Sequence, residues 1–276
     1  MAKENTPPLR RLEGQKTLLS RTMHDIAFDR IHDEIVVTSP FAQAILTFRG
    51  GASGEEPPLR VIQGPRTRIV ESRALDRLTV DPVHNEIYVT TSSYNILVFP
   101  REANGDVAPI RVIGGPDVVM GSRPGLRVDP VRNLLVVGTG YGGGVQAGVM
   151  VFDRLATGNA RPRAVIPGLT TGDQFALYPP TGLIIVNRDG AIEGWDIDEA
   201  LRVFENVTGT EKPEFRPRFR VTGQIPVSPN RGGGGTGIAL NPGHNEILTA
   251  SQTRNTVWTY SVPEAFTQGP PRTAAR

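Results

Sequence analysis

The sequence contains no cysteine among its 276 residues. Disulfides, thiolate metal sites and a cysteine nucleophile are therefore excluded. No stretch approaches the roughly 20 consecutive apolar residues of a transmembrane helix, and the N-terminal run MAKENTPPLRRLEG has no apolar segment typical of a signal peptide. If Met1 is the natural start, we expect a cytoplasmic protein without a transmembrane segment.

The sequence also lacks a strong excess of charge of either sign. Its 30 Lys and Arg residues balance 28 Asp and Glu residues, and the formal net charge is +2. Net charge therefore gives little support for binding to nucleic acid or to a membrane surface, and only a local basic patch would supply such a function.

Glycine and proline, by contrast, are abundant, and they recur at regular places that indicate turns. The clearest repeat runs from Leu78 to Gly115, LTVDPVHNEIYVTTSSYNILVFPREANGDVAPIRVIGG, and related copies occur about every 50 residues along the chain. Each copy contains short runs of Val, Ile, Leu and Phe that are too short for helices. In the clearest copy we predict strands over 78–81, 86–91, 95–99 and 110–113.

Four-stranded units repeated at this spacing are typical of a β-propeller. We predict an all-β, five-bladed β-propeller of four-stranded antiparallel blades, in a single domain over 8–266 with tails at 1–7 and 267–276. The blades are expected at about 24–64, 76–115, 125–168, 173–223 and 237–262. The chain opens with a lone strand at 8–14, which we expect to complete the last blade.

The pattern carried by Leu78–Gly115, an apolar residue followed by Asp-Pro, then Asn-x-Ile-Tyr-Val, Ile-x-Val-Phe and Arg-Val-Ile-x-Gly, resembles the NHL-type propeller repeat. It is also similar to the wider group of lactonase and streptogramin-lyase-like propellers. The resemblance implies the fold but no single activity, because propellers include both enzymes and binding platforms.

The loops of a propeller alternate between two faces, and basic residues gather in the loops expected on one of them. We predict that this face binds an acidic partner, with a protein favoured, an anionic membrane surface as a second choice and nucleic acid not expected. Only Tyr94 and Tyr141 would supply aromatic stacking there. The predicted binding residues are Arg66, Arg68, Arg123, Tyr141, Arg188, Arg231 and Arg254. Acidic loops, including those with Glu55 and Asp106, are expected on the other face.

A second interpretation places a catalytic or metal site where the first strands of the blades converge. His24, Asp76 and Asp173 occupy the same repeat position, with Asp25 beside them. One imidazole and two carboxylates hold a divalent cation or serve acid–base chemistry, as the lactonase resemblance also implies. The alternative function is therefore a metal-dependent hydrolase or lyase.

We favour a non-catalytic binding or scaffolding module, an accessory subunit of a larger and membrane-peripheral assembly, with no cofactor. His32, His84 and His244 share one position in the turn between the first two strands of three blades. A residue repeated in this way is expected to stabilise the turn, so we predict a structural role for all three.

Overall fold

The structure, a computed structural model, describes most of the chain in two compact units. The described residues are 7–20, 25–69, 75–118, 120, 124–138, 148–169, 175–188, 190–205, 213–223, 225, 237–251 and 256–267, with only the backbone described at 75, 76 and 251. The N-terminal unit is Met1–Val112 and the C-terminal unit is Ile113–Arg276.

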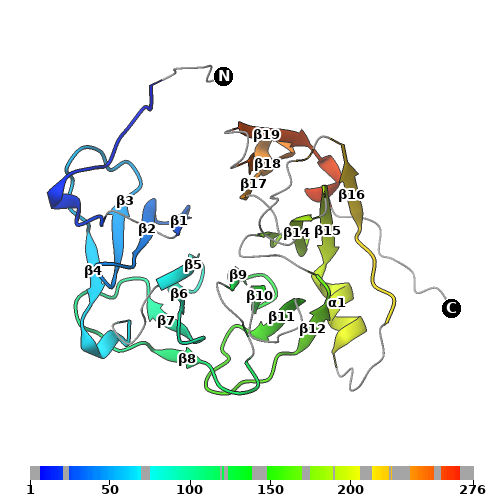
Figure 1. Ribbon diagram of the computed structural model, residues 1–276, viewed down its shortest axis with the longest axis horizontal. Coiled ribbons are helices and arrows are strands. Elements are labelled where there is room, and N and C mark those ends of the chain that lie inside the picture. Colours follow the sequence, from blue (N-terminus) through cyan, green and yellow to red (C-terminus); the bar gives the residue numbers. More distant parts are fainter. Residues whose placement is uncertain are drawn as a thin grey trace. The chain divides into compact units, whose positions relative to one another are not determined.

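The N-terminal unit contains two antiparallel sheets of four strands (Figure 1). Each sheet is a meander in which strands that follow one another along the chain are neighbours. The first sheet consists of β1 (Ile26–Asp29), β2 (Glu34–Ser39), β3 (Ala44–Arg49) and β4 (Arg60–Gln63), and the second of β5 (Leu75–Asp81), β6 (Glu86–Thr91), β7 (Ile96–Pro100) and β8 (Arg111–Ile113).

The C-terminal unit contains three further meanders, of which the last has three strands within the described residues. The third sheet consists of β9 (Gly125–Asp129), β10 (Leu134–Gly138), β11 (Gly148–Asp153) and β12 (Ala164–Pro167), and the fourth of β13 (Ala176–Tyr178), β14 (Leu183–Arg188), β15 (Ala191–Asp196) and β16 (Phe219–Thr222). The fifth consists of β17 (Ile238–Asn241), β18 (Glu246–Ser251) and β19 (Thr256–Ser261).

These sheets confirm the prediction of an all-β, five-bladed β-propeller fold. In the clearest repeat the second strand has the predicted bounds, and the first begins earlier, at Leu75. The middle strands of the first four sheets are buried along nearly their whole length, as expected for apolar runs with both faces covered. The lone N-terminal strand is seen only in a short parallel pairing of Leu12 with Gly54. Its place in the last blade, and the single domain over 8–266, stay predictions.

A buried aspartate organises the turn between the first two strands of each of the first three blades. The Oδ1 atom of Asp81 accepts hydrogen bonds from the backbone N–H groups of Val83 (3.0 Å) and His84 (3.1 Å). Its Oδ2 atom lies 2.7 Å from Nδ1 of His84. Asp29 and Asp129 make the same backbone contacts, with His32 and Arg132 in the place of His84. The predicted structural role of His32 and His84 is therefore confirmed, and His244 lies 3.4 Å from Asn241 at the matching turn.

The same turn ends at a residue in the left-handed region in all five blades, which explains the recurring Asn and Gly of the motif. The φ values are positive at Asp33 (53°), Asn85 (58°), Asn133 (58°), Gly182 (65°) and Asn245 (57°). Asn, Asp and Gly adopt this region at the lowest cost.

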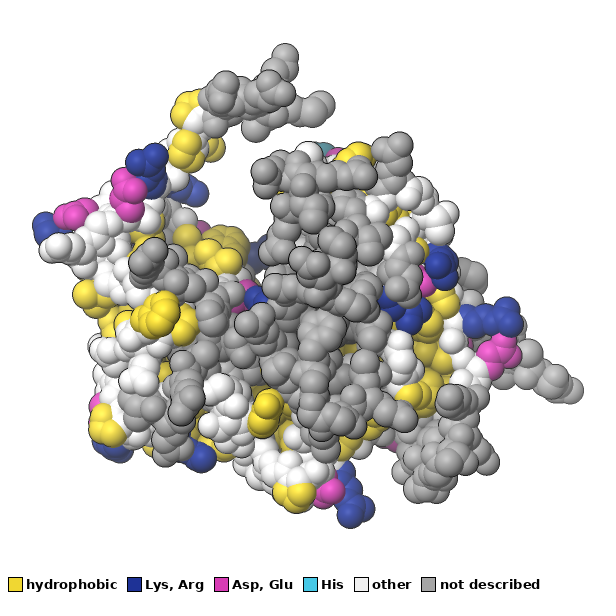
Figure 2. All heavy atoms as spheres, viewed as in Figure 1, with side chains coloured by type: hydrophobic (Ala, Val, Ile, Leu, Met, Phe, Trp, Pro, Cys, Tyr) yellow, Lys and Arg dark blue, Asp and Glu magenta, His cyan; other side chains and the backbone are white. Residues whose placement is uncertain are grey.

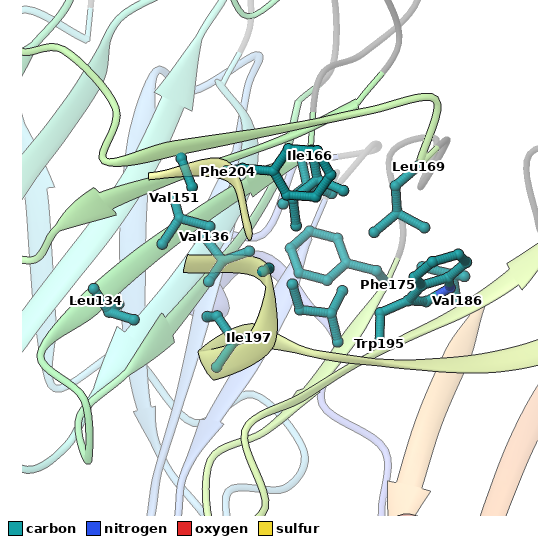
Figure 3. Packing of buried hydrophobic residues seen from close by; sticks show 14 residues of the cluster. Leu134, Val136, Val151, Ile166, Leu169, Phe175, Val186, Trp195, Ile197 and Phe204 are labelled. Atoms are coloured by element: carbon teal, nitrogen blue, oxygen red, sulfur yellow. The ribbon is translucent and has the colours of Figure 1, made fainter. Parts of the chain in front are cut away.

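A helix lies in the connection between the third and fourth strands of the fourth blade. Helix α1 spans Ile197–Phe204, and the carboxylate of Asp196 caps its start by accepting from the N–H groups of Asp198 and Glu199. Its buried face, which includes Phe204, packs beside β12 in a cluster with Ile166, Phe175 and Trp195 (Figures 1 and 3). No helix within the described residues has the length and hydropathy needed to cross a membrane.

Candidate functional site

The structure describes three of the seven residues predicted to form the basic binding face. Arg66 and Arg68 are exposed in the connection that follows β4, and Arg188 is the half-buried last residue of β14. The other four, Arg123, Tyr141, Arg231 and Arg254, lie outside the described residues.

Arg66 and Arg68 belong to a short 3-10 turn that occurs twice in the N-terminal unit. The turn η2 (Pro65–Thr67) carries Arg66, and η1 (Gln15–Thr17) carries Lys16 at the matching position. In both turns the threonine hydroxyl donates a 2.6 Å hydrogen bond to the carbonyl of the preceding glycine, Gly14 or Gly64. The turns therefore hold the exposed side chains of Lys16 and Arg66 on a fixed backbone.

Each turn is held against the following blade by a glycine and the residue after it. The N–H of Gly105 donates to the carbonyl of Val61 (2.6 Å), and the Gly105 carbonyl accepts from the N–H of Gln63 (3.1 Å). The carboxylate of Asp106 then accepts from the N–H of Arg66 at 2.7 Å. We call this arrangement the edge clamp, defined by the pairs Gly54–Glu55, Gly105–Asp106 and Gly158–Asn159.

The other two edge clamps are similar, although Glu55 accepts from the first residue after its glycine, where Asp106 and Asn159 accept from the second. Gly54 exchanges hydrogen bonds with Arg11 and Glu13, and Glu55 accepts from the N–H of Gln15 at 3.2 Å. In the C-terminal unit, Gly158 accepts from the N–H of Gly114, and the side-chain oxygen of Asn159 accepts from the N–H of Asp117 at 2.8 Å. The third turn thus presents the acid Asp117 where the first two present Lys16 and Arg66.

These contacts correct the predicted separation of basic and acidic loops onto two faces. Asp106 and Glu55 were both expected on the face opposite Arg66. Instead, Asp106 is bonded to the backbone of Arg66, and Glu55 to the residue before Lys16. The reason is that the loop between the third and fourth strands runs along the outer strand of the preceding blade, where it forms short parallel pairings. The backbone contacts leave the side chains of Lys16 and Arg66 exposed.

The side chain of Arg188 contacts Glu193, Gly168 and Trp195. Its Nη2 atom lies 2.9 Å from Oε2 of the buried Glu193, and its Nη1 atom donates to the carbonyl of Gly168 at 2.9 Å. Its guanidinium carbon lies 5.6 Å from the centre of the Trp195 ring. The carboxylate of Glu193 also accepts from Arg220 and from the indole N–H of Trp195. Arg188 therefore neutralises a buried carboxylate, and it has less capacity than Arg66 to bind an external anion.

Other arginines pair with acidic residues of the strands and loops. The buried Glu34 lies 2.9 Å from Arg101 and 2.5 Å from Arg60. Burial of Glu34 favours a higher pKa, but the hydrogen bonds from Arg60 and Arg101 outweigh it and lower the pKa. Glu56, Glu205 and Glu214 pair with Arg49, Arg163 and Arg216. Figure 2 shows Lys and Arg side chains beside Asp and Glu side chains at several places on the face that it draws.

The second predicted site lies largely outside the described residues. His24 and Asp173 are among the residues that the structure does not describe, and only the backbone of Asp76 is described, within β5. Their convergence stays a prediction. The carboxylate of Asp25, expected beside them, accepts from the N–H groups of Ile26 and Leu78, both at 3.0 Å. Within the described residues, no group of three or more His, Asp or Glu residues has the spacing of a metal site.

Comparison of the chain with models of known protein families gave no match, and comparison with curated proteins gave none either. The resemblance to the NHL-type repeat stays a prediction.

The role of the edge clamp was missed in the sequence, although a signal for it was present. The loops GGASGEEP, EANGDVAP and LATGNARP each place Glu, Asp or Asn directly after a glycine. Those glycines have φ values of 67°, 79° and 62° at Gly54, Gly105 and Gly158, as their turn chemistry indicated. The partner of each clamp lies about 40 residues earlier in the chain, so the loop sequence alone does not identify it.

Proposed function

We propose that the chain is a non-catalytic binding module that attaches to an acidic protein partner through the exposed cations of two matching 3-10 turns in the N-terminal unit. Its role is that of an accessory or scaffolding subunit in a larger assembly. The observation that carries the proposal is the exposure of Lys16 and Arg66 on two matching 3-10 turns, each fixed by an edge clamp. Arg68, also exposed, follows Arg66 at the end of the second turn.

Fixed turns favour binding because less conformational entropy is lost when the partner arrives. The backbone on either side of Arg66 is already held by Thr67 and Asp106, so mainly the side chain must be ordered. Neither Lys16 nor Arg66 forms an ion pair with another residue in the described part of the chain. Both cations are therefore available to an external carboxylate.

Stable binding of a partner requires several ion pairs to act together. An exposed ion pair contributes about 0.2–1 kcal/mol, so one cation alone does not hold a partner. A patch of cations also accelerates the encounter with an acidic surface, and this effect weakens as the salt concentration rises. We therefore expect partner binding that decreases steeply with salt.

The proposal is tested by reversing the charge of the two arginines in the second turn. Tagged full-length chain and the double variant Arg66→Glu/Arg68→Glu are used to purify partners from the native source. The matched control is Arg10→Glu/Arg30→Glu, which reverses two exposed arginines outside the 3-10 turns. We expect wild type and control to recover the same partners, and the Arg66/Arg68 variant to bind them about 10- to 100-fold more weakly.

Equal recovery by all three proteins would refute a role for this surface. Vesicles containing an anionic lipid provide a second arm of the experiment. Binding of wild type to vesicles but not to protein, with loss in the Arg66/Arg68 variant, would replace the protein partner with a membrane surface.

A further inference from the structure

An exposed phenylalanine lies in the turn between β2 and β3 of the first sheet (Figure 1). The side chain of Phe41 is 76% exposed, the largest exposed fraction of any aromatic residue that the structure describes. The turn is held by a hydrogen bond of 3.0 Å from the N–H of Gln43 to the carbonyl of Pro40. Phe41 therefore extends into solvent from a fixed hairpin turn and contributes little to the core.

This turn is joined to the connection that carries Arg66. The side-chain Nε2 atom of Gln63, the last residue of β4, donates to the carbonyl of Ala42 at 2.6 Å. Gly64 follows Gln63 directly and begins the 3-10 turn with Arg66. The hydrogen bond thus holds the turn of Phe41 beside the start of that 3-10 turn.

The same hairpin turn also contacts the connection that carries Lys16. The hydroxyl of Ser39, directly before the turn, donates to the hydroxyl of Ser20 at 2.8 Å. Leu19 and Ala42 pack against one cluster of buried residues. The chain between Lys16 and Ser20 therefore runs beside the hairpin turn.

Three neighbouring turns thus present two apolar side chains together with two cations. Leu18 follows Lys16 at the end of its 3-10 turn and is 52% exposed, while Lys16 and Arg66 are exposed. We call Leu18, Phe41, Lys16 and Arg66 the mixed patch. Aromatic and basic side chains together are typical of the energetically important part of a protein interface.

The acids of the edge clamps leave the two cations of the mixed patch available. The carboxylates of Glu55 and Asp106 accept from backbone N–H groups of the two 3-10 turns. Within the described residues neither carboxylate forms an ion pair with Lys16 or Arg66. The patch therefore matches a surface that is acidic and has an apolar depression.

The composition of the mixed patch favours a protein over a lipid surface. Stable attachment to a membrane takes several cations or a long apolar segment, and this patch has two cations and two apolar side chains. A single aromatic side chain, in contrast, can anchor a protein interface when a pocket encloses it.

We propose that the partner protein encloses Phe41 and Leu18 in an apolar pocket, and that Asp or Glu side chains on the rim of this pocket pair with Lys16 and Arg66. The inference rests on the proposed function, since it assigns the chemistry of the partner at the same 3-10 turns. Phe41 supplies the contact that salt does not screen, and the cations accelerate and orient the encounter.

Photo-crosslinking tests which residue meets the partner. The full-length chain, with p-benzoylphenylalanine replacing Phe41, is irradiated in extract of the native source. The matched control carries the same group in place of Ile31, which is 62% exposed in the turn at the opposite end of β2. We expect a cross-link to one protein from position 41 only, and Asp or Glu beside apolar residues in the cross-linked segment.

Affinities then measure the contribution of Phe41 to binding of the purified cross-linked protein. We expect Phe41→Ser to weaken binding about 10- to 100-fold and Ile31→Ser to bind as wild type does. The loss in Phe41→Ser should be equal at about 0.1 M and about 0.3 M NaCl, whereas the loss in Arg66→Glu/Arg68→Glu should shrink with salt. Equal melting temperatures of Phe41→Ser and wild type exclude unfolding as the cause.

The two proposals fail in different ways. Wild-type affinity of Phe41→Ser, with weak binding of Arg66→Glu/Arg68→Glu, would overturn the pocket and leave the proposed function intact. Wild-type affinity of both variants would refute both proposals. A cross-linked segment without Asp or Glu would overturn the acidic rim. Cross-linking of position 41 to phosphatidylserine–phosphatidylcholine vesicles, with no protein cross-linked, would replace the partner with a membrane.

Discussion

At the scale of single residues, the repeated polar positions of this chain act on the backbone. Asp81 is fully buried and accepts two backbone N–H groups in addition to the His84 ring. Removing the carboxylate would leave both N–H groups without their acceptor, and this loss costs free energy. The same reasoning applies to Asp29 and Asp129, which are also fully buried.

Replacement of Asp81 should therefore show which atom of the carboxylate matters. We expect Asp81→Ala to lower the free energy of unfolding by about 2–3 kcal/mol, because two backbone N–H groups lose their acceptor. Asp81→Asn keeps one side-chain oxygen and should cost only about 1 kcal/mol, as Asn241 stands at the matching position of the last blade. Urea denaturation of both variants measures the difference, and equal losses would contradict the account.

The ion pairs of Glu34 predict how stability depends on pH. The pKa of Glu34 is lower in the folded chain than its usual 4.5, so its contribution is complete above that value and is lost as the pH falls through the lowered pKa. Glu34→Gln removes the buried carboxylate that pairs with Arg60 and Arg101 and leaves Arg101 paired with the exposed Glu102. We expect it to cost about 3 kcal/mol near pH 7.

The melting temperatures of wild type and Glu34→Gln, compared between pH 7 and pH 3, check this prediction. The gap between the two proteins should narrow below about pH 4.5. A gap that stays constant over this range would show that the charge of Glu34 does not stabilise the fold.

At the scale of elements, the edge clamps connect the segment at Leu12 and the outer strands β4 and β8 to the loop of the following blade. Glu55 and Asp106 hold the turns η1 and η2 through their backbone, so the same residues stabilise the unit and position Lys16 and Arg66. The glycine before each turn permits the close approach of the acid, since a side chain there would collide with it.

Alanine variants at Gly64 and Gly223 distinguish the cost of backbone strain from the cost of losing the edge-clamp contact. Both have large positive φ values, 133° and 145°, but only Gly64 has a clamp carboxylate at its Cβ position. Alanine at either site should introduce strain of about 1–3 kcal/mol. Gly64→Ala should cost about 0.5–2 kcal/mol more, the value of a lost capping hydrogen bond. Thermal unfolding measures both variants, and equal destabilisation would argue against the clamp.

The elements also show what sequence reasoning achieved and where it failed. The strands and the turns at Asp81–Asn85 follow from local chemistry, because alternating turn residues and apolar runs specify them within a few positions. Contacts between blades were not predictable in this way, because they depend on which blade edges meet. Examples are the contact of Asp106 with Arg66 and the pairing of Glu34 with Arg101, 67 residues away in the chain. We predicted that every loop lies on one of the two faces of the propeller. The loop between the third and fourth strands instead runs along the outer strand of the preceding blade.

At the scale of the whole molecule, the fold class was predictable because the repeat occurs in every blade. The residues proposed to bind a partner were less predictable, because they occupy loops that differ between blades. Arg66 and Asp117 stand at corresponding places in two copies of one turn, with opposite charge. A periodic sequence identifies such a position, but the charge presented there follows only from the individual loop.

The central claim is that the chain acts as a subunit bound to other proteins, and the size of the native complex tests it most directly. The chain is purified from its native source under gentle conditions and at low salt, and its molar mass is measured by light scattering. Our account predicts a complex well above the 29.9 kDa of the chain, with other subunits present that dissociate as the salt concentration rises. A single species at 29.9 kDa without a partner would contradict it.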